Sequence, residues 1–260
     1  MNILEKIFAD KKKEVALKKS LIPASQLEQS VLFQRDCPSL STGLKESQSG
    51  IIAEHKRRSP SKSIINHGLN VDEVAQGYQD AGACGMSVLT DGKYFGGSLD
   101  DLLIARASVH IPLLRKEFIF DPYQIIEAKA YGADVILLIA AILDQQQIKT
   151  LSETAKSIGL EVLLEVHNEE ELQKSIMPSI DLLGVNNRNL KNFEVSLDTS
   201  KSLAKLIPDE FVKVSESGIS STAAIKELQP YGFKGFLIGE NFMKTDQPGE
   251  SAKSFISELL

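Results

Sequence analysis

Three consecutive apolar runs decide the fold: DVILLIA at 134–140, EVLLEVH at 161–167 and DLLGVNNR at 181–188. Each run is rich in Leu, Ile and Val and has the length of a buried strand. Along the chain such runs begin roughly 20 to 35 residues apart, the length of a βα unit whose helix returns the chain for the next parallel strand. The stretch therefore predicts a parallel sheet covered by helices.

The same pattern extends in both directions and gives eight runs in all. The other five are GIIAEHK at 50–56, GMSVLT at 85–90, IPLLRK at 111–116, FVKVSESG at 211–218 and KGFLIG at 234–239. Eight βα units are what a closed (β/α)8 barrel requires. We therefore predict the α/β class, with a single TIM barrel and an N-terminal helical extension.

The N-terminal extension is predicted to cover residues 1–45, and the barrel residues 46–260. Residues 2–19 have the spacing of an amphipathic helix, and 20–49 are polar and rich in Ser and Gln. So short a segment cannot bury a core of its own, so we expect it to pack on the barrel. The lysine run at 11–13 is expected to form a solvated helix face.

Helices are predicted between the strands, and several meet a glycine at their C-terminal end, as at Gly82, Gly132 and Gly159. The loops after the first two strands are long and rich in Gly and Ser, which is typical of functional loops at a barrel mouth. The predicted helices are 71–81, 99–108, 123–131, 144–158, 168–175, 196–205 and 221–229.

Charge and composition exclude several classes of protein. The net charge is −6, from 29 basic and 35 acidic residues, which disfavours a broad nucleic-acid-binding face. No apolar run approaches the roughly 18 residues of a membrane span, and the N-terminus does not resemble a secretory signal, so we expect a cytoplasmic protein without a membrane partner. The two cysteines, Cys37 and Cys84, are not expected to form a disulfide.

Polar and charged residues gather where the strands end. Because strand side chains alternate with period two, one set of faces carries apolar or small residues and then a charged or polar one. These faces would point into the barrel, and catalytic residues of such barrels lie at the C-terminal ends of the strands. A set of charges confined to one end predicts a functional site rather than a structural salt-bridge network. The set consists of Glu54, Lys56, Lys116, Glu165, Asn186, Arg188 and Glu216.

A phosphate site is predicted at the last two strands. Ser217 and Gly218 follow the seventh strand, and Gly239 and Glu240 follow the eighth. In barrels that bind phosphate esters, backbone N–H groups and helix N-termini at these turns hold the anion. Ser59 and Lys56 could add a hydroxyl donor and a cation. No zinc-type histidine spacing, P-loop or dinucleotide fingerprint occurs, so we expect no metal and no cofactor.

The run IIAEHKRRSPSKS at 51–63 resembles the first-strand signature of indole-3-glycerol-phosphate synthase, an E-x-K-x-x-S-P-S pattern. The resemblance continues, in order, through SVLTDGKYFGGSLDDL, IPLLRKEFIFDPYQIIEAKAYGADVILLI, LLEVHNEEEL, GVNNRNL, VSESGI and GFLIGENFM. It covers nearly the whole chain after about residue 50, and the N-terminal helix also fits the family. So many ordered motifs make the resemblance highly specific.

The resemblance implies closure of the indole ring of 1-(o-carboxyphenylamino)-1-deoxyribulose 5-phosphate, with loss of carbon dioxide and water, as a step of tryptophan biosynthesis. Lys116 would be the general acid on the ketone oxygen, and Glu165 the base in the loss of a proton and water. Glu54 and Lys56 would orient the substrate and share proton handling, and Asn186 would complete the catalytic group. Whether Lys116 or Lys56 is the acid in dehydration is open.

The resemblance also assigns the binding residues. Phe95 and Phe118 would pack against the anthranilate ring, Ser59, Pro60 and Ser61 would shape the first loop, and Arg188 and Glu216 would contact the substrate. The phosphate would be bound by Lys56, Ser217, Gly218, Leu237, Gly239 and the backbone N–H of Glu240.

Four positions depart from the commoner family pattern. Glu117 stands where aspartate is usual, His167 where asparagine is frequent, Glu240 where serine is frequent and Ser63 where glycine is frequent. A carboxylate at position 240 would repel a phosphate, so its side chain is expected to point away. None of these changes removes a proposed acid or base.

Two other functions remain as alternatives. An isomerase of phosphoribosylanthranilate type would need a cysteine and an aspartate at strand ends, but Cys84 precedes its strand. A non-catalytic binding protein would hold the same phosphorylated ligand without turnover. The small phosphorylated substrate is the expected partner, the expected oligomeric state is a monomer or weak homodimer, and contact with other tryptophan-pathway enzymes is possible.

Overall fold

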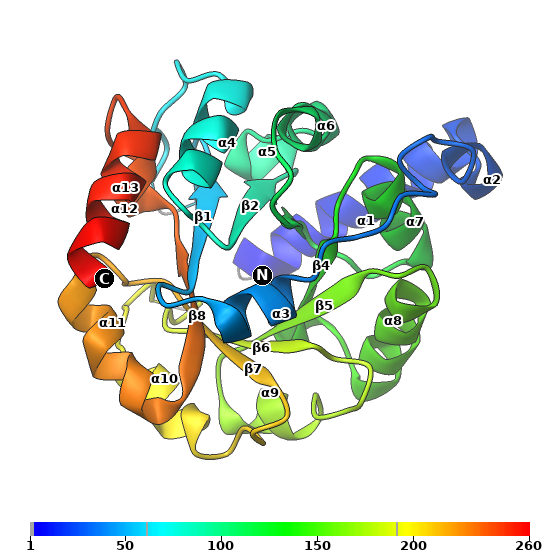
Figure 1. Cartoon of the computed structure of the whole chain (residues 1–260). Coiled ribbons are helices and arrows are strands. Elements are labelled where there is room, and N and C mark those ends of the chain that lie inside the picture. The colour runs from blue at the N-terminus through cyan, green and yellow to red at the C-terminus, as the bar shows by residue number, and fades with distance from the viewer. Residues whose placement is uncertain (1–2, 61, 191) are drawn as a thin grey trace.

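The computed structural model describes residues 3–60, 62–190 and 192–260. Within these ranges eight parallel strands form a closed barrel in chain order (Figure 1). Seven of the predicted runs contain one strand each, and the eighth overlaps β8, which begins one residue earlier, so the predicted fold is confirmed. The strands are β1 (Ile51–His55), β2 (Gly85–Leu89), β3 (Leu113–Lys116), β4 (Val135–Ile139), β5 (Glu161–Val166), β6 (Leu182–Asn186), β7 (Val212–Glu216) and β8 (Phe233–Ile238).

The seven predicted helices are confirmed, with ends that differ by at most two residues. Asp144, Asn168 and Ser221 were expected inside helices but are N-caps, whose side chains accept the first free backbone N–H groups. The helices that follow the strands are α4 (Val71–Asp80), α5 (Gly92–Phe95), α6 (Leu99–Ser108), α7 (Pro122–Ala130), α8 (Gln145–Ser157), α9 (Glu169–Gln173), α10 (Asp198–Ala204), α11 (Thr222–Leu228), α12 (Glu240–Met243) and α13 (Pro248–Leu259), with 3-10 turns η1 (Ala140–Ile142) and η2 (Gln229–Tyr231).

The barrel interior is filled by the faces that the period-two pattern predicted. Ile52, Leu114, Leu163 and Val214 pack together inside the barrel. Their neighbours along each strand, such as Ala53 on β1, pack outward against the ring of helices. The strands are therefore buried on both faces, as parallel strands covered by helices must be.

Three helices precede β1, and they reach both ends of the barrel. α1 (Ile3–Leu21) lies at the C-terminal ends of the strands, α2 (Ala24–Leu27) packs on α7, and α3 (Leu40–Glu46) closes the opposite end (Figure 1). Leu40 and Leu44 of α3 are fully buried. Gly85 leaves the space for Leu40, because a Cβ there would lie 2.7 Å from the Leu40 Cδ1 atom. The division of the chain at residue 45 stays a prediction, because packing does not show whether a segment folds on its own.

The prediction of a solvated lysine face on α1 was wrong for Lys11. Its side chain is only 2% exposed, and its Nζ lies 2.9 Å from Asp91 Oδ2 and 3.2 Å from Glu117 Oε1. Burial opposes the charge, but Glu117 and Asp91 outweigh burial and raise the pKa of Lys11. Lys12 and Lys13, by contrast, are exposed. The sequence could not distinguish the three because Asp91 and Glu117, the two buried partners of Lys11, lie far from it in the sequence.

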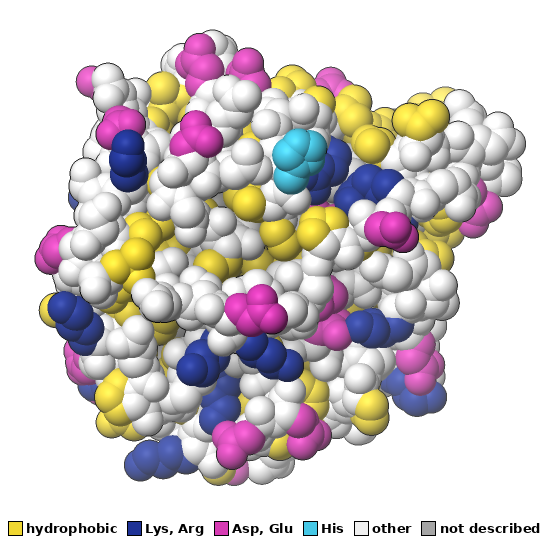
Figure 2. Space-filling model, in the orientation of Figure 1, with side chains coloured by type: hydrophobic (Ala, Val, Ile, Leu, Met, Phe, Trp, Pro, Cys, Tyr) yellow, Lys and Arg dark blue, Asp and Glu magenta, His cyan; other side chains and the backbone are white. Residues whose placement is uncertain are grey.

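The face that carries α3 has acidic and basic side chains interspersed (Figure 2). This face therefore presents no broad field of one sign. Among the residues that the structure describes, no helix is long and apolar enough to cross a membrane.

Acid should destabilise the protein through His55, which is 1% exposed on the outward side of β1. Burial, with help from the charge of Arg57, lowers the pKa of His55 from 6.5 to about 4. Unfolding thus takes up a proton between these values, so stability is lost as pH falls from 6.5 towards 4, by about 3 kcal/mol. Urea denaturation at several pH values should show this loss in the parent protein. The His55→Gln variant should lack this part of the loss, and a difference between the two proteins that is independent of pH would contradict the assignment.

Candidate active site

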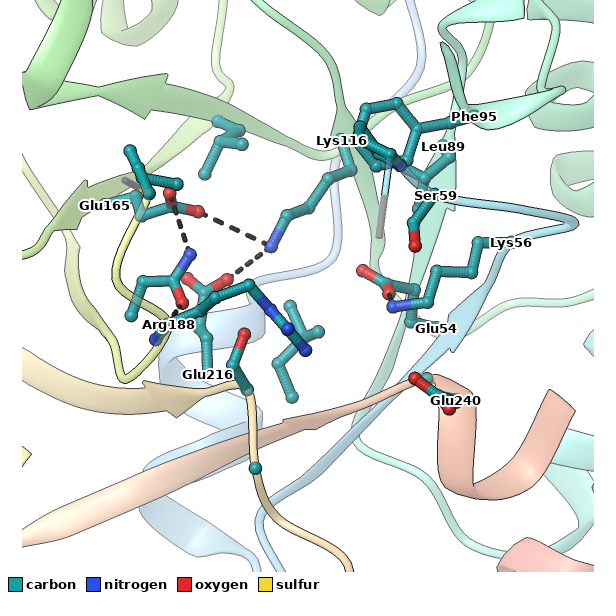
Figure 3. Close-up of a pocket in the computed structure, with 18 of the residues that line it drawn as sticks. Glu54, Lys56, Ser59, Leu89, Phe95, Lys116, Glu165, Arg188, Glu216 and Glu240 are labelled. Carbon is teal, nitrogen blue, oxygen red and sulfur yellow. Dashed lines mark hydrogen bonds and ion pairs between the residues drawn. The ribbon is translucent and has the colours of Figure 1, made fainter. Parts of the chain in front are cut away.

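The C-terminal ends of the strands surround a pocket of about 360 Å³ (Figure 3). Every predicted site residue within the described ranges lines it, whereas Ser61 lies outside the described residues. The lining includes Glu54, Lys56, Ser59, Pro60, Phe95, Lys116, Phe118, Glu165, Asn186, Arg188, Glu216, Ser217, Gly218, Leu237, Gly239 and Glu240.

Lys116 lies between two carboxylates at the centre of the pocket (Figure 3). Its Nζ contacts Glu216 Oε2 and lies 3.7 Å from Glu165 Oε2. Burial would lower the pKa of Lys116, but Glu216, Glu165 and Glu54 together raise it. The sequence left this balance open, and the structure resolves it in favour of the charged ammonium. Lys116 is therefore protonated at neutral pH.

Glu216, which contacts Lys116, has a raised pKa. Burial raises its pKa to about 7; Lys116 opposes the shift, and the charge of Glu165 adds to it. Gly184 on β6 provides the room for Glu216, because a Cβ there would lie 2.5 Å from the Glu216 Oε1 atom. Two carboxylates thus share one lysine, and Glu216 takes up a proton near neutral pH.

Glu165 is held by Asn186 at the end of β6 and by His167, which follows β5. Its Oε1 accepts a hydrogen bond of 3.1 Å from Asn186 Nδ2, and Asn186 Oδ1 accepts one of 3.0 Å from the backbone N–H of Arg188. The ring Nε2 of His167 lies 3.3 Å from the same Glu165 oxygen. These contacts fix Glu165 with its other oxygen, Oε2, on the side of Lys116.

Glu54 and Lys56 form a second pair across the pocket (Figure 3). Lys56 Nζ lies 2.7 Å from Glu54 Oε1, and Ser87 Oγ donates a hydrogen bond of 3.3 Å to Glu54 Oε2. Burial would raise the pKa of Glu54, but Lys56 and Lys116 outweigh it and lower the pKa. Gly239 faces this pair, because a Cβ there would lie 2.5 Å from Glu54 Oε1. The Glu54 side chain therefore takes the space that a side chain at position 239 would need.

The turn after β7 has a conformation that suits an anion. Ser217 and Gly218 both have positive φ angles, 66° and 80°. Ser217 is held there by Asn187, whose Nδ2 donates a hydrogen bond of 3.1 Å to the Ser217 carbonyl. Successive backbone N–H groups in such a turn form a concavity for anions. A Cβ at position 218 would meet Val195 Cγ1 at 2.4 Å, so glycine is required there too.

After β8, the Glu240 carboxylate is directed at Lys62 of the first loop. Glu240 Oε1 lies 2.9 Å from Lys62 Nζ, and this cation lowers the pKa of the Glu240 carboxyl group. Leu237 lies two residues before Gly239 on β8, in register with Ile52 on β1 and Glu216 on β7. Its side chain packs with Ile52 and forms part of the apolar wall. Its assignment to the phosphate stays a prediction.

An aromatic and aliphatic wall completes the pocket. The rings of Phe95 and Phe118 lie 6.0 Å apart, centre to centre. Ile3, Leu4 and Ile7 of α1 line the pocket from above. The sequence predicted that α1 is amphipathic but not that it lines the site. No pattern within residues 3–21 indicates which part of the barrel the helix covers.

A closed (β/α)8 barrel with a partly buried lysine between two carboxylates and an anion-type turn after β7 is typical of a phosphate-binding barrel enzyme. A family model described as indole-3-glycerol phosphate synthase matches residues 4–255. The chain belongs to this family, and its activity is that of a carboxy-lyase of tryptophan biosynthesis.

Curated relatives named indole-3-glycerol phosphate synthase match along their whole length. The protein from Bacteroides thetaiotaomicron is 48% identical over 258 residues, 99% of each chain. The protein from Polaromonas naphthalenivorans is 42% identical over 261 residues, again 99% of each chain.

Solved structures of other enzymes share the fold alone. One is 3-hexulose-6-phosphate synthase from Salmonella typhimurium, with a TM-score of 0.63 at 13% identity, covering 81% of this chain and 98% of that one. Another is thiamine phosphate pyrophosphorylase from Pyrococcus furiosus, with a TM-score of 0.60 at 15% identity, covering 82% and 98%.

Proposed function

We propose that Lys116 and Glu165 are the acid and base that close the indole ring of 1-(o-carboxyphenylamino)-1-deoxyribulose 5-phosphate. The observation that carries this proposal is the position of Lys116, a partly buried ammonium between Glu216 and Glu165. The aromatic wall and the anion-type turns line the same pocket. One ligand with a ring at one end and a phosphate at the other matches this arrangement.

The two ends of the substrate would be bound first. The backbone N–H groups of Ser217, Gly218 and Glu240 would donate to the phosphate, and Lys56 would add a cation. Phe95 and Phe118 would pack against the anthranilate ring, and burial of that ring is favourable. Ser59, Pro60 and Ser61 would form the first loop over the substrate. Fixing both ends brings the aromatic carbon and the ketone carbon together.

Lys116 would then act as the general acid in ring closure. The ring carbon that carries the carboxylate attacks the ketone carbon, and the ketone oxygen takes a proton from the Lys116 ammonium. Carbon dioxide leaves with its bonding electrons returned to the ring system. Arg188 and Glu216 would contact the substrate, and Glu54 and Lys56 would orient it.

Glu165 would serve in the dehydration that follows. Its Oε2 would take the proton from the carbon beside the nitrogen, and the hydroxyl would leave as water, which completes the aromatic ring. Asn186 holds Glu165 in place through the hydrogen bond to Oε1. An acid is also required for the departing hydroxyl, and either Lys56 or Lys116 would supply it.

The Glu165→Gln variant should slow the chemical steps by about 10² or more, because glutamine keeps the shape of glutamate but cannot accept the proton. Single-turnover kinetics should show this loss with little change in substrate affinity. Glu153→Gln on the exposed face of α8 is the matched control and should leave the rate unchanged. A Glu165→Gln rate constant equal to that of the parent would remove Glu165 from the role of base.

A fluorescence assay for indole-3-glycerol phosphate, with the proposed substrate and EDTA present, tests the function as a whole. Turnover under these conditions is expected. Folded protein that binds the substrate without turnover would instead favour a binding protein, and absence of both would favour a different phosphorylated substrate.

We also propose that the protein works in the cytoplasm as a monomer or weak homodimer. Cys37 and Cys84 are both free, as is usual in a reducing compartment. Light scattering over a range of concentrations should give the mass of the monomer or a concentration-dependent rise towards twice that mass. A larger stable assembly would contradict this proposal.

A further inference from the structure

His167 follows β5 and lies between two carboxylates. Its Nε2 is 3.3 Å from Glu165 Oε1, and its Nδ1 is 3.1 Å from Glu171 Oε2 on α9. The side chain is only 10% exposed. The three side chains thus form a continuous line from the pocket to the first turn of α9.

The first turn of α9 is arranged to hold Glu171 in this place. Glu171 Oε2 also accepts a hydrogen bond of 2.9 Å from the backbone N–H of His167. Its other oxygen accepts one of 2.9 Å from Asn168 Nδ2, and Asn168 caps the helix through the backbone N–H of Glu171. These hydrogen bonds therefore hold the Glu171 side chain in a single position against His167.

The geometry favours the protonated imidazole. An ionised carboxylate only accepts hydrogen bonds, whereas a neutral imidazole has one N–H group and an imidazolium has two. Nδ1 lies within hydrogen-bond distance of Glu171 Oε2, and Nε2 lies at ion-pair distance from Glu165 Oε1. A neutral His167 that donates from Nδ1 would leave the lone pair of Nε2 beside the Glu165 carboxylate, whereas the imidazolium places a positive charge there.

The charges around His167 support the same state. Glu165 faces it from β5, Glu171 from α9 and Glu216 from β7, while Lys116 of β3 lies beyond Glu165. η1, which packs against α9 and β5, contributes only Ala140, Ala141 and Ile142. Burial opposes the charge, but the carboxylates outweigh it and raise the pKa of His167.

We propose that His167 is a positioning residue for the ring-closing reaction: as an imidazolium held by Glu171, it forms an ion pair with Glu165 Oε1. This inference rests on the proposed role of Glu165 as base. Asn186 Nδ2 donates a hydrogen bond to the same oxygen, so Oε1 is held by a hydrogen bond and a positive charge, and Oε2 remains as the oxygen that takes the proton. Loss of the His167 proton would remove that charge from Oε1 and allow Glu165 to turn.

The first test measures the charge of His167 without turnover. The chain has only four histidines, so NMR can follow each imidazole through a pH titration, with His167 assigned from the His167→Gln variant. The pKa of His167 should exceed the ordinary 6.5 in the parent and move to lower values in both Glu171→Gln and Glu165→Gln. A parent pKa at or below 6.5 would overturn the proposal, whether or not Glu165 is the base.

The second test measures whether the reaction uses that charge. In the parent, kcat should fall on the alkaline side as His167 loses its proton, and Glu171→Gln should move this fall to lower pH. His167→Leu should lower kcat about tenfold with KM little changed, and His167→Gln, which keeps a neutral donor, should restore part of the loss without the alkaline fall. Superimposable profiles of parent and Glu171→Gln would reduce His167 to a structural contact of α9.

The two tests separate this inference from the proposed function. If Glu165→Gln retained the parent single-turnover rate, Glu165 would not be the base. A raised pKa of His167 measured by NMR would still show that His167 is charged. Titration of Glu216 would also affect the pH profile, but Glu171→Gln should move that part less, because Glu171 contacts His167 whereas Glu216 contacts Lys116.

Discussion

Replacing Lys116 with alanine should abolish measurable turnover, a loss in kcat of up to about 10⁴, because the ketone oxygen would lose its proton donor. The phosphate turns and the aromatic wall do not depend on this side chain. The variant should therefore still bind a reduced substrate whose ketone has become an alcohol and which cannot close its ring. Steady-state fluorescence assays measure the first effect and calorimetry the second.

Lys149→Ala is the matched control for this prediction. Lys149 is an exposed lysine on α8, paired only loosely with Glu153 at 3.3 Å. This variant should keep the parent kcat and KM, because exposed ion pairs contribute little. Near-parental turnover of Lys116→Ala would remove Lys116 from the acid role, and a loss of ligand binding would show that it holds the substrate as well.

Lys11→Met should weaken the docking of α1 by about 3 to 5 kcal/mol, the usual cost of leaving a buried charge without its partner. The variant would leave Asp91 and Glu117 buried at the base of the loops after β2 and β3. Because Ile3, Leu4 and Ile7 line the pocket, looser docking should also raise KM. Urea denaturation, hydrogen exchange of α1 and steady-state kinetics measure these effects.

Lys13→Met on the same helix is the control, since Lys13 is exposed. Surface substitutions of this kind usually change stability by less than about 0.5 kcal/mol. Identical stability, exchange and KM in the two variants would show that the Lys11 ion pairs do not hold α1 on the barrel.

The barrel could be predicted because its signals are local. A strand such as Val135–Ile139 shows itself by five consecutive apolar residues, and the distance to the next run fixes the parallel βα connection. The period-two rule then placed Lys116, Glu165 and Glu216 at one end without any knowledge of their partners.

Other elements lacked such signals. α3 was missed because its seven residues include Ser, Thr and Gly, and its helical form is stabilised by burial of Leu40 and Leu44 in the barrel end. α13 was also missed, although Pro248 at its first position and the apolar pair Phe255 and Ile256 are a detectable pattern.

By itself, the sequence determined the barrel, its strands and the types of residue that meet at its mouth. It also carried the ordered motifs by which the family resemblance was found, and the family is confirmed. These properties follow from the alternation of side chains, the spacing of the apolar runs and the types of residue, all of which can be recognised over short stretches of sequence.

Only the tertiary structure decided which charges act on one another. Lys116 and Glu216 are 100 positions apart in sequence, and Lys11 and Glu117 are 106 apart, yet each pair is in contact. The charge state of Lys116 depends on burial against the pull of three carboxylates from β1, β5 and β7. Coulomb energies depend on distance and on the surrounding medium, and closure of the barrel sets both.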